Sequence, residues 1–346
     1  MSKQLGKKST SAIHIAVTAA IAAISATSAM AQTSVTISGA IDLGVNTQTS
    51  AATGQRVTSL QNGGFQTSYL HFAGTEDLGG GMKADFKLGT FFQANNGTDG
   101  RFPGDTFFSR DANVALTGDF GRVTAGRQIS PLYLSTLLFN PFDDSFSFSP
   151  IILHTYNAFG AGNVINADSG YSNAISYTTP NFDGLNATIL YTLAGQIGIS
   201  NSYSANVLYF HGPFAATLAY ENTTADTTNS FVGVYPTGST QKVTQLGLSY
   251  DFAPAKVYFQ YERNDTPGIA STLNTLQVGA KINVGRGNIL ASYAKTDGVV
   301  DHKTFSLGYD YDMSKRTDIY TMYMNDQAAA YVDTVNSFSV GIRHRF

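Results

Sequence analysis

The sequence contains no cysteine and no tryptophan, and charged residues make up only 13 % of its 346 residues. The absence of cysteine excludes a disulfide framework and any chemistry that needs a thiolate. The charged fraction is well below the ~25 % that is usual in soluble domains. Beyond the first 31 residues, no hydrophobic run is long enough for a membrane helix. The chain has instead 34 glycines, 19 tyrosines and 23 phenylalanines, a composition that fits a transmembrane β-barrel.

The first 31 residues have the form of a secretory signal peptide. A lysine-containing start is followed by a short apolar stretch from Ile13 to Ala26, and Ala29-Met30-Ala31 is a small-x-small cleavage site. A membrane anchor is the alternative, but the apolar stretch is shorter than the ~20 residues that span a bilayer. We therefore expect a mature chain from Gln32, with its formal charge changed from −3 to −6 by the loss of three lysines. Nothing in this balance suggests a nucleic-acid partner.

From residue 34 onward, apolar and polar residues alternate with a period of two, as strands between lipid and water do. In the segment 83–88, Ala84, Phe86 and Leu88 share one face, and two lysines and an aspartate share the other. A lysine that faces lipid near mid-bilayer costs ~2–4 kcal/mol, so we expect the charged face to point inward. The facing of the strand near 319–324 stays open, because apolar residues occupy both parities there.

Tight turns rich in glycine, proline and aspartate alternate along the chain with longer polar connections, the first of them at 49–66. Counting both kinds gives seven short and eight long connections, which join sixteen strands. An even strand number, with short turns at one end and long loops at the other, is typical of bacterial outer-membrane barrels. A soluble β-sandwich lacks this difference between its two ends. We therefore predict an all-β fold, a 16-stranded antiparallel transmembrane β-barrel formed by residues 32–346 as one domain.

One connection, from Ser130 to Tyr171, is much longer than the others and does not alternate. Loops of this length are uncommon in compact domains and are usually functional when they occur. The interior of a barrel is the one place where such a loop is protected. We expect residues 131–171 to fold into the lumen and to narrow a channel there.

Several short motifs occur in a fixed order: FAGTEDLGGG at 72–81, SR at 109–110, VAL at 114–116, GRQ at 126–128, NAISY at 173–177, PNF at 180–182 and VGIRHRF at 340–346. In this order they resemble the trimeric general porins of Gram-negative bacteria, most closely those of β-proteobacteria and Neisseria. The resemblance covers essentially all of the chain from residue 32. It implies a homotrimer in outer-membrane lipid, passive diffusion of ions and small hydrophilic solutes, and an inward-folded third loop. It also implies that Phe346 ends an assembly signal.

In general porins, basic side chains on the barrel wall face acidic side chains on the third loop. The resemblance assigns the acidic side to Asp143 and Asp144, and Arg110 stands where family members carry a wall arginine. Charged walls in a narrow passage select ions and orient polar solutes. Alternatives remain open: the aspartates can belong to an ordinary Asx turn, and Arg110 to a solvated strand end. Strict alternation would even point Arg110 outward, unless a bulge intervenes.

Tyr69, Ala73 and Ser176 stand where the family often has further arginines. The resemblance thus implies a weakened field across the pore and argues against strong anion selectivity. Tyr69 and Ser176 are kept as constriction residues. The third loop is also rich in leucine and aromatic residues, which either pack it against the wall or line the passage. In the second case the protein would be a substrate-specific channel for weakly polar or aromatic solutes.

Arg127 shares its parity with Val123 and Ala125 on the expected lipid face. A cation at that place needs a partner. In related porins the second loop of a neighbouring subunit latches onto this region, and Asp99 or Asp105 could then be the acceptor. The alternative is that Arg127 snorkels or pairs within its own chain.

Two other classes of function are weighed against a channel. An outer-membrane hydrolase would need a serine and a histidine beside an orienting group, but the histidines are scattered and none stands in a nucleophile motif. No group of residues has metal-ligand spacing, and no phosphate-binding glycine loop occurs. We therefore expect no catalytic residues, no cofactor and no metal. A structural barrel or adhesin with a plugged lumen is the second rival, and conductance would distinguish it.

Overall fold

The computed structural model describes residues 34–156, 168–193, 200–225, 238–265, 272–297, 301–328 and 333–346. The predicted signal peptide lies outside these residues, as does the part of the long central segment at 157–167. Among the described residues, no helix is both long enough and apolar enough to cross a bilayer.

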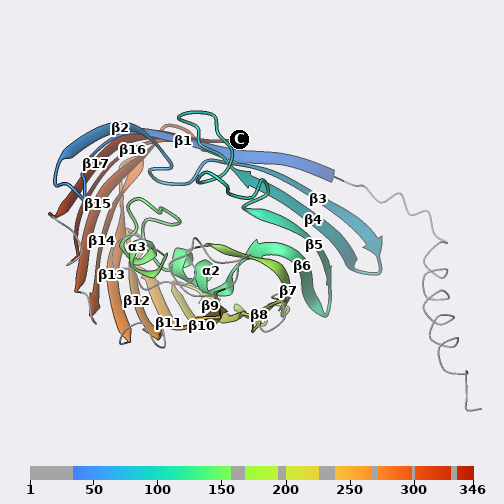
Figure 1. The fold of residues 1–346 in the computed structure, drawn as a ribbon. Coiled ribbons are helices and arrows are strands. Elements are labelled where there is room, and N and C mark those ends of the chain that lie inside the picture. Colours follow the sequence, from blue (N-terminus) through green and yellow to red (C-terminus); the bar gives the residue numbers. More distant parts are fainter. Residues whose placement is uncertain are drawn as a thin grey trace, which may run out of the picture.

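Strands dominate the structure and form one antiparallel sheet that closes into a barrel (Figure 1). The strands are β1 (Ser34–Thr49), β2 (Arg56–Asn62), β3 (Tyr69–Gly79), β4 (Met82–Phe91), β5 (Asp111–Gly118), β6 (Gly121–Ile129), β7 (Gly170–Thr178), β8 (Leu185–Thr192), β9 (Tyr203–His211), β10 (Phe214–Thr224), β11 (Thr240–Asp251), β12 (Ala255–Asp265), β13 (Leu273–Val284), β14 (Gly287–Asp297), β15 (His302–Asp312), β16 (Thr317–Ala328) and β17 (Val335–Arg345). From β3 onward each strand pairs with the next, and β1 pairs with β17 to close the ring.

The short strand β2 was not predicted, because its residues lie in the stretch read as a long polar connection. The upper part of β1, Leu43–Thr49, pairs with β2, and the lower part, Ser34–Ala40, pairs with β3. These two strands therefore share one place in the ring beside β1. The ring accordingly has sixteen strand positions, which confirms the predicted fold class although seventeen strands are present.

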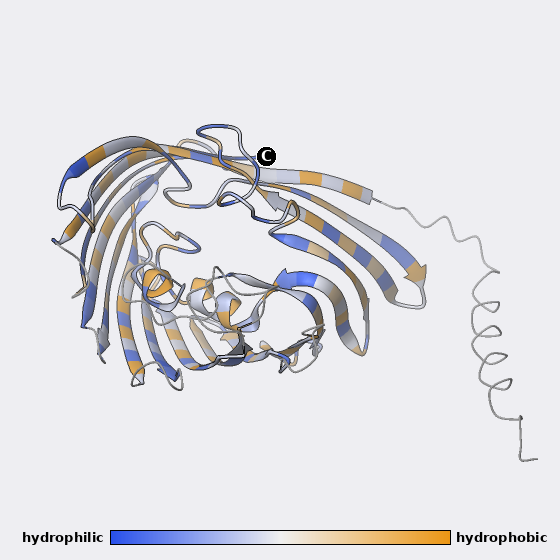
Figure 2. Cartoon of the chain, viewed as in Figure 1, coloured by the Kyte–Doolittle hydropathy of each residue, from blue (hydrophilic) through white to orange (hydrophobic). Residues whose placement is uncertain are grey.

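Hydropathy alternates along most strands, as Figure 2 shows. Large apolar side chains on one face of the sheet are exposed; Phe338, Val340 and Ile342 of β17 are 51 %, 52 % and 48 % exposed. The opposite face carries mainly polar side chains that are buried, and we call it the inner face. On β16 the inner face carries Tyr320 and Met322, whereas Ile319 is exposed, so the facing left open by the sequence is now assigned.

The central segment contains two short helices, α2 (Pro131–Leu138) and α3 (Pro150–Tyr156), where the sequence suggested only irregular structure. Ser130 caps α2 by accepting a hydrogen bond from the backbone N–H of Tyr133 at 2.9 Å. Proline is favoured at the first helical position, because its missing N–H would have no partner there. Both helices begin at a proline, Pro131 and Pro150.

Both helices pack against the inner face: α2 contacts β8–β11, and α3 contacts β13–β15 (Figure 1). Wall amides hold the backbone of this segment, because Asn206 donates to the carbonyl oxygen of Pro131 at 2.9 Å and Gln260 to that of Thr136 at 3.0 Å. The approach is close enough to require glycine. A Cβ added at Gly247 would lie 2.9 Å from the Phe139 ring.

Candidate functional site

A cavity of about 240 Å³ lies between the inner face of β3–β5 and the central segment. The wall contributes Tyr69, His71, Lys87, Phe91, Arg110 and Asp111, and the segment contributes Tyr133, Leu137 and Asp144. The structure thus brings together three of the residues predicted for a constriction, namely Arg110, Asp144 and Tyr69.

Arg110 points to the inner side even though alternation with Val114 predicted the outer side. The reason is that β5 begins only at Asp111, so the parity of the strand does not bind Arg110. Its guanidinium carbon lies 3.9 Å from the centre of the Tyr69 ring, and its Nε lies 3.5 Å from the Asp111 carboxylate. Stacking of a guanidinium on an aromatic ring contributes ~0.5–2 kcal/mol of favourable interaction energy. It also holds the cation over the face of the ring.

Asp143 and Asp144 are held in place by the side chain of Asn140. Its oxygen accepts from the Phe142 backbone N–H at 2.9 Å, and its amide donates to the Asp143 carbonyl oxygen at 2.9 Å. Asp143 has a backbone φ of 46°, in the left-handed region that aspartate tolerates. The turn is therefore stabilised by Asn140 and does not use either carboxylate.

Burial among protein atoms raises the pKa of both carboxyl groups above the usual aspartate value, although the Asp143 side chain itself reaches solvent. Arg110 partly offsets this rise in the pKa of Asp144, and Lys281 partly offsets it for Asp143. Gln66 also donates to the Asp144 carboxylate at 3.3 Å. Arg343 lowers the pKa of both aspartates, whereas Arg110 acts on Asp144 and Lys281 on Asp143.

The second cationic group lies on the inner face of β13–β17. Arg343 pairs with Asp318 at 2.9 Å and Asp310 at 3.6 Å, and its guanidinium carbon lies 4.0 Å from the centre of the Phe65 ring. Arg345 also reaches Asp318, at 2.8 Å. Sequence reasoning gave these two arginines no role. Alternation could have suggested one, because Asp310 and Asp318 share the inner face of the neighbouring strands.

Ser176 lies apart from the cavity. It is 5 % exposed, and its hydroxyl donates to the Gln128 side chain at 2.6 Å. Its side chain thus joins β7 to β6 within the barrel wall.

Arg127 pairs within its own chain, which was one of the two alternatives. Its guanidinium lies 2.6 Å from the Asp168 carboxylate and donates to the Ser109 carbonyl oxygen at 2.7 Å. Arg101 bridges the same aspartate at 2.6 Å and Asp105 at 2.8 Å. Although burial alone would raise it, the two arginines hold the pKa of Asp168 below its usual value.

Of the two acceptors suggested for a neighbouring Arg127, Asp105 is engaged by Arg101. Asp99 is exposed and pairs with Phe92 through an isolated bridge.

Phe346 closes the seam between the first and the last strand. Its backbone N–H and carbonyl oxygen each bond to Gly39, both at 3.1 Å. Its ring is 40 % exposed and covers Gly39 so closely that an added Cβ would lie 2.6 Å from the ring.

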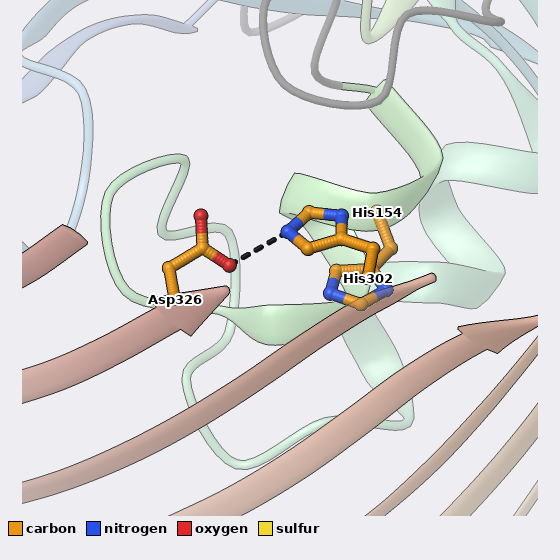
Figure 3. Close-up of side chains that lie close together, drawn as sticks. All are labelled: His154, His302 and Asp326. Carbon is orange, nitrogen blue, oxygen red and sulfur yellow. Dashed lines mark hydrogen bonds and ion pairs between the residues drawn. The ribbon is translucent and has the colours of Figure 1, made fainter. Parts of the chain in front are cut away.

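His154, His302 and Asp326 form a group whose nitrogen and oxygen atoms lie within 4.8 Å of one another (Figure 3). The two imidazole rings are stacked, with centroids 3.8 Å apart and planes 10° from parallel. A metal ion binds in the plane of an imidazole ring at ~2.0–2.1 Å, so one ion cannot lie in the planes of two stacked rings. The arrangement therefore does not fit a metal centre. Sequence reasoning missed this group, because its members are far apart in the chain.

Comparisons with known proteins identify the family and the fold. A family model described as Gram-negative porin matches residues 16–330. Outer membrane porin protein 32 of Delftia acidovorans is 35 % identical over 310 residues, which cover 84 % of this chain and 83 % of the relative. Major outer membrane protein P.IB of Neisseria meningitidis serogroup B is 26 % identical over 342 residues, 91 % of this chain and 95 % of the relative. The solved structure of an anion-selective porin from Comamonas acidovorans matches with a TM-score of 0.76 and 27 % identity, covering 91 % of this chain and 100 % of that one.

Proposed function

Because this chain belongs to the Gram-negative porin family and is an outer-membrane channel, we propose that its passage runs between the central segment and the wall cavity that holds Arg110. The observation that carries this proposal is the group of Tyr69, Arg110 and Asp144 around one cavity. In a space of this kind, charges on the wall and on the segment act on every ion that passes. Residues 131–171 are then the constriction, and ions and small hydrophilic solutes diffuse through it without chemistry.

Its ion selectivity is proposed to be weak. Around the wall cavity, Lys87 and Arg110 stand against Asp111 and Asp144. On the other side of the segment, three cations, Lys281, Arg343 and Arg345, stand against Asp143 and the aspartates of the neighbouring strands. Balanced charges leave little net field along the axis, in contrast to the solved relative that is described as anion-selective.

Reversal potentials of the purified protein in a planar bilayer test this proposal. Under a KCl gradient we expect stepwise conductance and a reversal potential near zero. A strong anion preference would overturn the balance argued for the passage. A protein that inserts but does not conduct would contradict the channel itself and favour a plugged barrel.

A preference for weakly polar or aromatic solutes is a second proposal, supported by the rings of Tyr69, Phe91 and Tyr133 around the cavity. Liposome swelling would measure it. We expect small aromatic solutes to enter faster than sugars of equal size. Equal rates would leave a general diffusion channel and remove the specific one.

We further infer a homotrimer, processing after Ala31 and an assembly role for Phe346. Mass spectrometry of the mature protein should then give an N-terminus at Gln32, and intact Met1 would contradict it.

Phe346→Ala should lower the fraction of folded barrel in outer membranes, because the Phe346 ring covers the Gly39 seam. An unchanged folded fraction would show that Phe346 has no such role.

A further inference from the structure

The histidine group on the far side of α3 is linked to the barrel wall by a continuous series of hydrogen bonds. His154 of α3 contacts Thr296 of β14 through Nδ1 and Thr304 of β15 through Nε2, both at 2.7 Å. Thr304 donates to Asp326 of β16. His302 also bonds to Asp326, at 2.6 Å (Figure 3). Thr296 in turn contacts Thr275 of β13 at 2.7 Å. One side chain of α3 thus reaches four strands.

The carboxylate of Asp326 fixes the direction of these hydrogen bonds. An ionised carboxylate only accepts, so the hydroxyl proton of Thr304 is committed to Asp326. The Thr304 oxygen must then accept from Nε2–H of His154. A neutral His154 that carries its proton on Nε2 then accepts from the Thr296 hydroxyl at Nδ1, and this single arrangement of protons satisfies both contacts without placing a charge on the ring.

We propose that His154 is a positioning residue of the channel, whose neutral ring holds α3 against the wall and keeps the passage open. The inference rests on the proposed function, because it assigns α3 to the constriction. Thr155 adds a second tether in another direction, with a hydrogen bond of 2.9 Å to Glu262 of β12. Release of His154 therefore lets α3 swing away from β14 and β15, toward the passage.

Protonation is expected to release the ring. A second proton on His154 would require Nδ1 to donate, which reverses the hydroxyl bonds of Thr296 and Thr275. It would also place a cation against the stacked ring of His302. Burial first, and then His302, keep the pKa of His154 well below its usual value, with Asp326 acting in the opposite direction.

The surroundings of His154 contain few other charges. Among the described residues, β15 presents His302 and β16 presents Asp326, whereas β13 and β14 present only the hydroxyls of Thr275 and Thr296. From α2, Tyr133 packs on Tyr156 of the same helix α3. The protonation of His154 is therefore governed mainly by burial and by these two strand residues.

The test is single-channel recording of His154→Phe, which keeps the stacked ring and removes both hydrogen bonds. At pH 7 we expect the ratio of closed to open time to rise about tenfold, because two neutral hydrogen bonds are lost. Wild type should close increasingly on acidification, whereas His154→Phe should show no further rise over the same pH range. His344→Phe is the matched control, because His344 is exposed on the outer face; it should behave like wild type.

If His154→Phe does not fold, Thr296→Val can be tested in its place, since it removes only the hydroxyl that bonds to Nδ1 of His154. It should raise the closing ratio less, and in the same direction. Closing ratios and pH profiles identical to wild type in a folded variant would overturn the positioning role while leaving the channel intact. A wild-type protein without conductance would instead contradict the proposed function.

Discussion

At the scale of single residues, the proposed passage depends on a few charges whose positions follow from local backbone features. Arg110 faces inward because it precedes its strand, and the turn at Asp143 and Asp144 does not use their carboxylates because Asn140 stabilises it. These features decide which charges an ion meets. Each of them can therefore be tested by removing one charge without altering the backbone.

We expect Asp144→Asn to shift selectivity toward anions and Arg110→Gln toward cations. A unit charge ~7 Å from an ion in water changes its free energy by ~0.6 kcal/mol, which corresponds to a change of about two- to threefold in relative permeability. Reversal potentials measure this shift. Asp183→Asn, in the short turn between β7 and β8, is the matched control. Shifts of the same sign in Asp144→Asn and Arg110→Gln would contradict the assigned roles.

Selectivity should also depend on pH, because burial raises the pKa of Asp143 and Asp144. As the pH falls through these raised values, both carboxylates gain protons and lose their negative charge. Anion preference should therefore begin to increase at a higher pH than exposed aspartates would allow. Reversal potentials from pH 7 downward measure the profile. The double variant Asp143→Asn, Asp144→Asn should lack this step, and a step of equal size in it would assign the titration elsewhere.

At the scale of elements, the central segment is held by shape as well as by hydrogen bonds. Gly247 of β11 faces Phe139, and Gly279 of β13 faces Pro141, where an added Cβ would lie 2.8 Å from the proline ring. Glycine at these two places lets the segment lie directly on the wall. The segment therefore fits against the wall at only one distance from it.

We expect Gly247→Ala to displace the segment, because its Cβ would lie 2.8 Å from a Thr217 methyl and 2.9 Å from Phe139. Overpacking of this kind costs about 1–3 kcal/mol. Single-channel conductance should change, and the thermal unfolding temperature in detergent should fall. Ala280→Val, which enlarges a side chain on the outer face of β13, is the control. Unchanged conductance and stability in Gly247→Ala would mean that the segment has room for the added methyl group.

At the scale of the whole molecule, the barrel could be predicted because alternation is a local signal that every strand repeats. The number of strand positions, the inner lysines of β4 and the two faces of β17 all followed from it. The short strand β2 could not be predicted, because it pairs only with half of β1. The helices α2 and α3 were missed because they span only eight and seven residues, too few to show a helical period.

The site was predictable only in part, for a related reason. Arg110, Asp144 and Tyr69 came from a resemblance and now share a cavity, whereas Ser176 from the same resemblance does not. The stack of His154 on His302 depends on how a helix docks on strands that lie about 150 residues later in the chain. No pattern in the sequence reports such a contact.

Trimer stability is the prediction that belongs to this scale. Arg127→Ala leaves the buried Asp168 with fewer partners, and breaking a buried ion pair costs about 3–5 kcal/mol. We expect a lower dissociation temperature of the oligomer in semi-native electrophoresis. Arg263→Ala removes an exposed pair and should have no measurable effect. Equal dissociation temperatures for Arg127→Ala and wild type would show that this intrachain cluster does not support the proposed trimer.

The wall holds helix α2 in part by its peptide groups, since Asn206 and Gln260 donate to the backbone carbonyl oxygens of Pro131 and Thr136. Such bonds do not depend on which side chain the segment carries at the same residue. Substitutions that face the passage can therefore accumulate while the anchorage is retained. The backbone of the segment can therefore stay in place while the side chains that line the proposed passage change, which gives both evolution and engineering a simple route to new permeation properties.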